Sequence, residues 1–236
     1  MAVAGKTLLA ICRVSNLPTV WMNVLAAAIL AAGSPPVSAV FVLLVALSAS
    51  YAGGMVLNDY CDREIDGIEQ PFRPIPAGRI GEAEALRLAI VLLGLGLGLL
   101  TLTPYPSAVV PAGVLLVAIY AYDRWHKSHP ASVFLMAATR TLVFVVTARA
   151  VAGHVSGLVL FAGALSFLWT LAVTVVARRE NARGERYSFP VIPWMIATMA
   201  TLDGLVLAVF VHPLWILAGL AATLLTRLGQ QYVRGD

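Results

Sequence analysis

Residues 58–66 have the sequence NDYCDREID and follow a long apolar segment in a chain that carries few charges. If this stretch is helical, Asn58, Asp62 and Asp66 lie at positions i, i+4 and i+8, and Asp59 falls on the same side. Carboxylates packed so closely repel one another unless a cation lies among them. Because Mg2+ prefers oxygen ligands of this kind, the stretch predicts a metal site at the end of a membrane helix.

The composition is that of a membrane protein. The chain has 236 residues, of which 60% are hydrophobic and 12% charged, and its mean hydropathy is +0.86. Soluble domains usually carry about 25% charged residues. We therefore expect one integral membrane domain over residues 1–236, without a cleaved signal peptide. The net charge of +4 comes largely from the connections, so it indicates contact with the lipid bilayer and no nucleic-acid partner.

Apolar segments of spanning length recur along the chain, and we expect each to be a helix because isolated strands cannot satisfy their backbone in lipid. Eight such segments lie at about 18–33, 36–57, 86–103, 107–121, 131–152, 156–177, 190–211 and 213–230. The predicted fold class is therefore all-α, a polytopic transmembrane helical bundle. Polar clusters after the second and the sixth segment suggest two pseudo-repeats, about 1–121 and 131–230.

The Lys and Arg residues fall on alternate connections. Apart from Arg140 and Arg149, all of them lie near the N-terminus, in the longer connections or near the C-terminus. The short connections at 34–35, 104–106 and 212 contain none. By the positive-inside rule, the N-terminus and the polar connections lie in the cytoplasm. The chemistry is therefore expected at the cytoplasmic face of the cell membrane.

Two connections carry groups that suit anion binding. The sequence RPIPAG begins at Arg73, whose guanidinium suits phosphate oxygens unless it only anchors the helix end. Tyr122 and Lys127 lie at the end of the fourth segment, where Asp123 is placed to pair with Lys127 four residues further on. His126 is expected too close to solvent to be a metal ligand.

Further charges lie in and after the later segments. Arg140 stands well inside the fifth segment, where a guanidinium is costly and needs an acid, a bound anion or a neighbouring helix as its partner. Arg178, Arg179 and Glu180 follow the sixth segment. This cluster is interpreted either as a positive-inside connection or as a second part of the anion site.

These motifs resemble those of the UbiA superfamily of intramembrane prenyltransferases. Residues 58–66 match its first aspartate-rich motif, N-D-x-x-D-x-x-x-D, and RPIPAG matches the R-P-x-P-x-G that follows. Tyr122 with Lys127 is similar to its tyrosine-and-lysine motif, and Arg13, Asn16 and Asn23 resemble its opening segment. The resemblance implies a bundle of usually nine helices around a central cavity, together with Mg2+ and an isoprenyl diphosphate donor.

The second aspartate-rich motif of the superfamily, D-x-x-x-D with a glycine four residues on, is incomplete here. Alignment on Gly184 puts Glu180 at the second Asp and Val176 at the first, with Arg178 and Arg179 between them. We expect these arginines to supply positive charge to the diphosphate in place of a second Mg2+. The combination of motifs is most similar to the EboC-type branch of the superfamily.

The resemblance implies a prenyltransferase that moves an isoprenyl group from an allylic diphosphate to an unidentified small or lipophilic acceptor. The expected Mg2+ ligands are Asn58, Asp59, Asp62, Asp66 and Glu180. The expected catalytic residues are Asp59, Asp62, Asp66 and Lys127. The expected diphosphate-binding residues are Arg73, Tyr122, Arg140, Arg178 and Arg179. A lipid carrier and a non-catalytic relative of the same fold are the alternatives.

Overall fold

The computed structural model describes residues 5–127, 129–184 and 187–233, and the regular structure within them is helical throughout. The α-helices are α1 (Gly5–Ile11), α2 (Leu17–Ala32), α3 (Val37–Glu69), α4 (Glu82–Leu99), α5 (Val109–Trp125), α6 (Ser132–Ala152), α7 (Gly157–Arg183), α8 (Val191–Ala197), α9 (Met199–Phe210) and α10 (Trp215–Tyr232). Short 3-10 helices extend or join them: η1 (Val14–Asn16), η2 (Leu100–Leu102) and η3 (Pro106–Ala108). Arg186 and Arg234, two of the arginines expected in the cytoplasm, lie outside the described residues.

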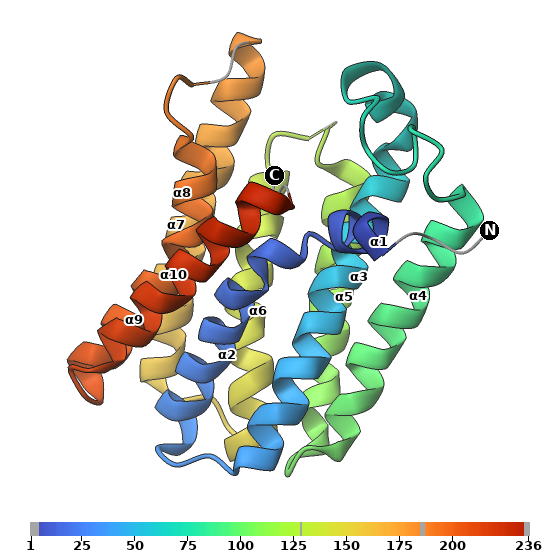
Figure 1. The fold of residues 1–236 in the computed structure, drawn as a ribbon. Coiled ribbons are helices and arrows are strands. Elements are labelled where there is room, and N and C mark those ends of the chain that lie inside the picture. Colours follow the sequence, from blue (N-terminus) through green and yellow to red (C-terminus); the bar gives the residue numbers. More distant parts are fainter. Residues whose placement is uncertain (1–4, 128, 185–186, 234–236) are drawn as a thin grey trace.

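The helices run side by side in one bundle whose longer connections gather at one end (Figure 1). That end, called the polar end below, carries the α3–α4, α5–α6 and α7–α8 connections, together with α1 and the last turns of α10. The short α2–α3, α4–α5 and α6–α7 connections lie at the opposite end. The predicted all-α bundle is confirmed, and the predicted alternation of long and short connections is present.

Seven helical stretches in the described part of the chain are long and apolar enough to cross a membrane. They correspond to the first seven expected segments, with α8 and α9 together forming the seventh. The eighth expected segment is helical as α10, but its last turns carry Arg227, Gln230 and Gln231, which shorten its apolar stretch. The chain is thus a multi-pass membrane protein, while the predicted internal repeat stays a prediction.

Two helices continue well beyond the expected apolar segments. Helix α3 runs through the whole acidic stretch to Glu69 and ends before Pro71, a residue that disfavours helix at the position preceding it. Helix α7 likewise includes Arg178, Arg179 and Glu180, which were expected in a connection, and ends at Gly184 in a left-handed conformation. The helical geometry assumed for the acidic stretch is therefore confirmed.

The α3–α4 connection folds back over the end of α3. Helix α4 packs closely against α3 because Gly96 has no side chain; a Cβ atom there would lie 2.2 Å from the Ser50 hydroxyl. Ile75 and Ile80 of the connection are buried against Val56 at the end of this helix pair. Burial of these side chains fixes the connection and holds Arg73 over the acidic face of α3.

Candidate active site

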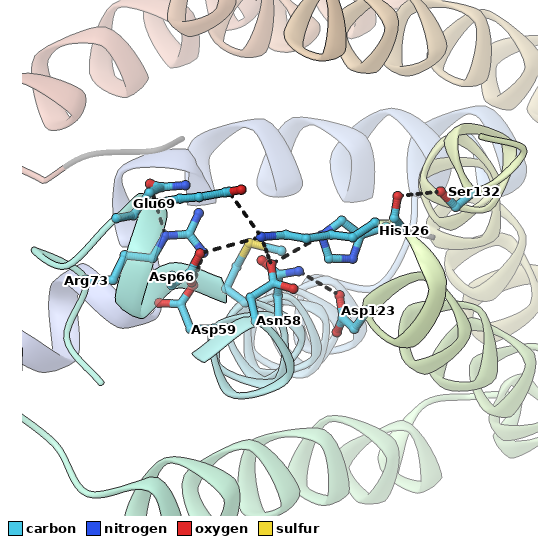
Figure 2. Close-up of polar contacts among 12 residues, drawn as sticks. Asn58, Asp59, Asp66, Glu69, Arg73, Asp123, His126 and Ser132 are labelled. Atoms are coloured by element: carbon cyan, nitrogen blue, oxygen red, sulfur yellow. Dashed lines mark hydrogen bonds and ion pairs between the residues drawn. The ribbon is translucent and has the colours of Figure 1, made fainter. Parts of the chain in front are cut away.

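The acidic side chains of α3 form one buried face at the polar end (Figure 2). Asn58, Asp59 and Asp62 are 4–7% exposed, and Asp66 is fully buried. Their spacing along α3 places them on successive turns of the same side, as the sequence predicts. The three carboxylates in this shared buried environment require positive charge nearby, since an unpaired buried carboxylate is costly.

Two arginines supply part of that charge. Arg13, in the turn between α1 and η1, donates from Nη2 to Asp59 Oδ1 at 3.0 Å. Arg73 donates from Nη1 to the same Asp59 oxygen at 3.2 Å and to Asp66 Oδ2 at 2.7 Å. The Arg73 guanidinium therefore lies within the acid cluster, and its predicted role in binding phosphate oxygens stays a prediction.

A third cation comes from the α5–α6 connection. The Lys127 ammonium lies 3.9 Å from Asp62 Oδ2, 3.8 Å from Asp66 Oδ1 and 3.7 Å from Glu69 Oε2. The expected pairing of Lys127 with Asp123 is not what the structure shows, because the lysine side chain reaches across to α3. Lys127 therefore joins the tyrosine-and-lysine motif to the first acidic motif.

His126 lies deeper in the site than expected. Its imidazole is only 16% exposed, its Nε2 lies 3.2 Å from Asp62 Oδ2, and its ring stacks on Tyr122 with a centroid distance of 4.9 Å. Burial lowers the pKa of His126, but the hydrogen bond and negative charge of Asp62 outweigh burial, so the pKa is raised above its ordinary value. Tyr122 thus contacts the site through His126.

Asp123, at the end of α5, completes the acid cluster from the other side. Its Oδ1 accepts a hydrogen bond from Asn58 Nδ2 at 3.2 Å. Two buried oxygens, Asp123 Oδ2 and Asp66 Oδ1, have no hydrogen-bond partner within the described residues. Unsatisfied buried oxygens of this kind are where a bound cation or a hydrogen-bond donor on a substrate finds partners.

The donor set fits Mg2+ that arrives with a phosphate ligand. Within the described residues, no three His, Cys, Asp or Glu side chains converge as a ready-made metal cage. The acids are instead held by Arg13, Arg73 and Lys127. Mg2+ commonly takes one or two carboxylates and completes its shell with water and substrate phosphates, so a cage is not needed. Asp62 and the unsatisfied oxygen of Asp66 are the clearest donors.

A cavity opens below this cluster, between α2, α3, α5 and α6. It has a volume of about 80 Å3, is partly open to the surface, and has a largely apolar lining. Tyr122 and Asp123 lie at its polar end, and Arg140 lines it further along α6. An apolar lining with a few polar groups at one end is the character of a site that holds a largely apolar ligand.

Arg140 belongs to a polar network inside the bundle. It lies eight positions after Ser132 at the start of α6, which is about 12 Å along a helix. Its guanidinium donates to Asn23 Oδ1 at 2.8 Å and to the Thr19 hydroxyl at 3.3 Å. Asn23 in turn donates to Asp203 Oδ2 at 2.5 Å, so Asn23 links the arginine to a buried acid of α9. The role of Arg140 in diphosphate binding stays a prediction.

The residues of the incomplete second motif lie elsewhere. Arg178 donates to the carbonyls of Pro130 at 2.8 Å and His126 at 3.0 Å, and to the Ser132 hydroxyl at 2.7 Å, so it holds the α5–α6 connection in place. Arg179 is exposed and Glu180 half-buried on the end of α7, which Figure 1 draws on the side of the polar end away from α3. Their predicted roles toward diphosphate and Mg2+ are not tested by these contacts.

Reasoning from the sequence missed several members of the site. Arg13 was counted among the cytoplasmic charges and the opening segment, but it was not predicted to be a site residue. His126 was set aside as too close to solvent. Asp203 was not singled out, although an acid inside an apolar segment is rare enough to be a signal. Each contacts residues far away in the chain: Asp203 and Asn23 are 180 positions apart.

The fold and site define a polytopic membrane protein with a buried acid cluster above an apolar cavity. The family model described as the UbiA prenyltransferase family matches residues 17–233, so the chain belongs to that family. Two curated relatives match about half of this chain or more. A digeranylgeranylglyceryl phosphate synthase of Methanospirillum hungatei is 34% identical to this chain over 127 residues. The match covers 53% of this chain and 45% of the relative. A 4-hydroxybenzoate octaprenyltransferase of Vibrio vulnificus is 35% identical over 160 residues, 66% of this chain and 54% of the relative. The chain thus spans about half the length of these curated relatives.

Solved structures share the fold. A structure of digeranylgeranylglyceryl phosphate synthase in membranes has a TM-score of 0.66 at 20% identity. The match covers 97% of this chain and 95% of the other chain. A UbiA homolog from Archaeoglobus fulgidus bound to DMAPP and Mg2+ has a TM-score of 0.62 at 15% identity, covering 92% and 86%. The UbiA resemblance is thus confirmed at the level of family and fold. The EboC-type branch stays a prediction.

Proposed function

We propose that the protein is a Mg2+-dependent prenyltransferase. It transfers an isoprenyl group from an allylic isoprenyl diphosphate to a small or lipophilic acceptor at the cytoplasmic side of the membrane. The observation that carries the proposal is the buried acid face of α3, with Arg73 and Lys127 placed among its carboxylates above an apolar cavity. Mg2+ and DMAPP bound to the Archaeoglobus fulgidus homolog support the choice of donor.

The residues divide into two roles. Asp62 and Asp66, with Asn58 and Asp59 beside them, hold Mg2+, which neutralises the diphosphate and stabilises it as a leaving group. Arg73 and Lys127 bind the remaining phosphate charge, and the cavity below encloses the isoprenoid tail and excludes water. The bond between the allylic carbon and the diphosphate oxygen breaks with its electron pair on the diphosphate. The acceptor nucleophile bonds to that carbon and releases its proton to water.

The positive charges of the polar end support a cytoplasmic site. This end carries Lys6, Arg13, Arg63, Arg73, Arg79, Arg87, Arg124, Lys127, Arg178, Arg179, Arg183 and Arg227. Under the positive-inside rule the N-terminus is then cytoplasmic, and donor and acceptor meet at the inner face of the cell membrane.

The test is Mg2+-dependent release of diphosphate by the purified protein. Geranyl, farnesyl and geranylgeranyl diphosphates are supplied, with and without a membrane-free extract as the acceptor source. We expect release from the preferred donor, and we expect Asp62→Ala to reduce the rate by at least about a hundredfold because a metal ligand is lost. Glu64→Ala is the matched control, since Glu64 lies on the same helix but its side chain is 84% exposed.

Full activity in Asp62→Ala, or release that persists in EDTA, would refute the metal assignment. Mg2+-dependent binding of the same diphosphates without release would favour a lipid carrier or a non-catalytic relative. The prenylated compound recovered from the extract would identify the acceptor.

A further inference from the structure

Arg178 on α7 makes its described hydrogen bonds with one short segment, residues 126–132, which joins α5 to α6. Its Nη1 donates to the Pro130 carbonyl at 2.8 Å, and its Nη2 donates to the His126 carbonyl at 3.0 Å and to the Ser132 hydroxyl at 2.7 Å. The buried Ser132 hydroxyl also lies 3.3 Å from the His126 carbonyl (Figure 2). One guanidinium from a different helix therefore holds both ends of this segment.

The end of α5 needs a partner from outside its own helix. Helix α5 ends at Trp125, with His126 as its C-cap. The last carbonyl groups of a helix have no partner within it, and a cationic side chain there is favourable. Arg178 lies 52 positions further along the chain and provides that partner. Because a guanidinium offers several N–H groups in a rigid plane, one arginine can fix several acceptors, which an ammonium on a flexible stem does less well.

Lys127 lies inside this held segment, next to His126. Its ammonium is 3.7–3.9 Å from oxygens of three acids, too far for direct hydrogen bonds, and its side chain is 33% exposed. Contacts of this length do little to fix a flexible side chain, so the placement of the ammonium depends on the backbone that carries it. That backbone belongs to the segment that Arg178 holds. A displacement of about 1 Å in a group that acts on a substrate can cost about a hundredfold in rate.

We infer that Arg178 is a positioning residue, which keeps Lys127 over the acidic face of α3. The inference rests on the proposed prenyl transfer, in which Lys127 binds phosphate charge. The end of α7, where an acid of the second aspartate-rich motif is missing, then contributes through the α5–α6 connection. Arg178 was expected to bind the diphosphate itself, and the two roles differ in what Arg178 does once Lys127 is removed.

The first test measures the position of Lys127 without turnover. Lys6 and Lys127 are the two lysines of the chain, so in a Lys6→Arg background sulfo-NHS acetate reports on Lys127, with the N-terminal amine resolved by peptide mass spectrometry. The labelling uses full-length protein in detergent with EDTA and no donor. We expect Arg178→Ala to raise the acetylation rate of Lys127 about threefold or more, because the ammonium is no longer kept among the acids. Arg178→Lys, which keeps the charge but loses the planar guanidinium, should give an intermediate rate.

The matched control is Arg183→Ala, because Arg183 is exposed near the end of the same helix and its guanidinium stacks on Tyr187. It should leave the Lys127 rate within about twofold of the parent. Thermal unfolding in the same detergent distinguishes faster labelling of a folded variant from unfolding. If Arg178→Ala does not fold, Ser132→Ala takes its place, since it removes one of the groups that Arg178 holds. An unchanged Lys127 rate in the folded variant would overturn the inference.

A kinetic cycle separates this role from direct binding of the diphosphate. In the diphosphate-release assay, Arg178→Ala should lower kcat/KM about tenfold or more, and it should divide the loss between kcat and KM as Lys127→Ala does. The double variant Lys127→Ala/Arg178→Ala should lie within about twofold of Lys127→Ala, because Arg178 then has no ammonium to position. Losses that multiply would overturn the inference and show that Arg178 acts on the substrate directly. A wild-type protein that releases no diphosphate would contradict the proposed transfer, while the labelling result would still decide the role of Arg178.

Discussion

Removal of the Arg73 guanidinium tests whether the buried acid cluster depends on cations supplied by the protein. Arg73 donates to Asp66 at 2.7 Å and to Asp59 at 3.2 Å, and Asp66 is fully buried. In Arg73→Ala both carboxylates lose this partner while remaining shielded from water. Breaking one side of a buried ion pair typically costs about 3–5 kcal/mol, because the other charge stays buried without compensation.

The remaining contacts place the expected loss in the free energy of unfolding at the low end of that range. Arg13 still donates to Asp59 at 3.0 Å, and Lys127 still lies 3.8 Å from Asp66. We therefore expect Arg73→Ala to lower the free energy of unfolding by about 3 kcal/mol. For a chain of this size that corresponds to a fall in Tm of about 6–12 °C. The five tryptophans of the chain supply a fluorescence signal for thermal unfolding in detergent.

A double-mutant cycle with Asp66→Asn identifies the cause. If the penalty comes from the uncompensated Asp66 charge, the double variant should lose about 1–2 kcal/mol less than the sum of the single variants. The exposed control Arg87→Ala should change stability by no more than about 0.5 kcal/mol. The reasoning is refuted if Arg73→Ala unfolds within about 3 °C of wild type, or if the two single effects simply add.

Two further predictions concern other polar contacts. Because Asp62 raises the pKa of His126, the pair stabilises the fold fully below the unfolded pKa of about 6.5, and this contribution is lost as pH rises through the raised folded pKa. The Tm advantage of wild type over His126→Gln should therefore be largest near about pH 6 and shrink toward about pH 8. Asn23→Leu removes the link between Arg140 and Asp203 and should lower Tm by about 6–12 °C, the effect of about 3 kcal/mol.

Each of these has its own control. A Tm difference for His126→Gln that is constant with pH would show that packing against Tyr122, and not charge, makes the contribution. For Asn23, the comparison is Thr174→Val, which removes a hydroxyl bonded only within its own helix in the described contacts. If both variants unfold at the same temperature, the hydrogen bonds between helices do not stabilise the fold more than a hydrogen bond within one helix does.

The fold is predicted well from the sequence because the fold depends on local patterns of apolar and polar residues. Apolar segments of membrane length predict helices directly, since lipid offers the backbone no other partner. The spacing of Asn58, Asp59, Asp62 and Asp66 likewise predicts one helical face, and α3 provides it. Helix ends are harder to predict, because the polar turns that extend α3 and α7 beyond the apolar segments have no hydropathy signal.

The partners of the acids could not be predicted, because they are set by packing between distant segments. Asp59 meets an arginine 46 positions earlier, and Asn58 meets an acid 65 positions later. Spacing favoured the local pair of Asp123 with Lys127, but a flexible lysine reaches the larger concentration of negative charge across the site. Burial then decides the outcome, because shielded carboxylates interact more strongly with a cation than an exposed one does.

The contacts of the acid cluster also indicate which of them a diphosphate with Mg2+ would replace first. The two arginines make direct bonds of 2.7–3.2 Å, and their side chains are only 14% exposed. Lys127 is 33% exposed and stays 3.7–3.9 Å from three different acids, so its contacts are longer and more screened by water. An incoming cation competes most easily with the weakest of these contacts. We therefore expect Lys127 to leave the carboxylates and turn to the phosphate oxygens. Arg73 keeps its Nη1 bonds to Asp59 and Asp66 and offers its other N–H groups to the diphosphate.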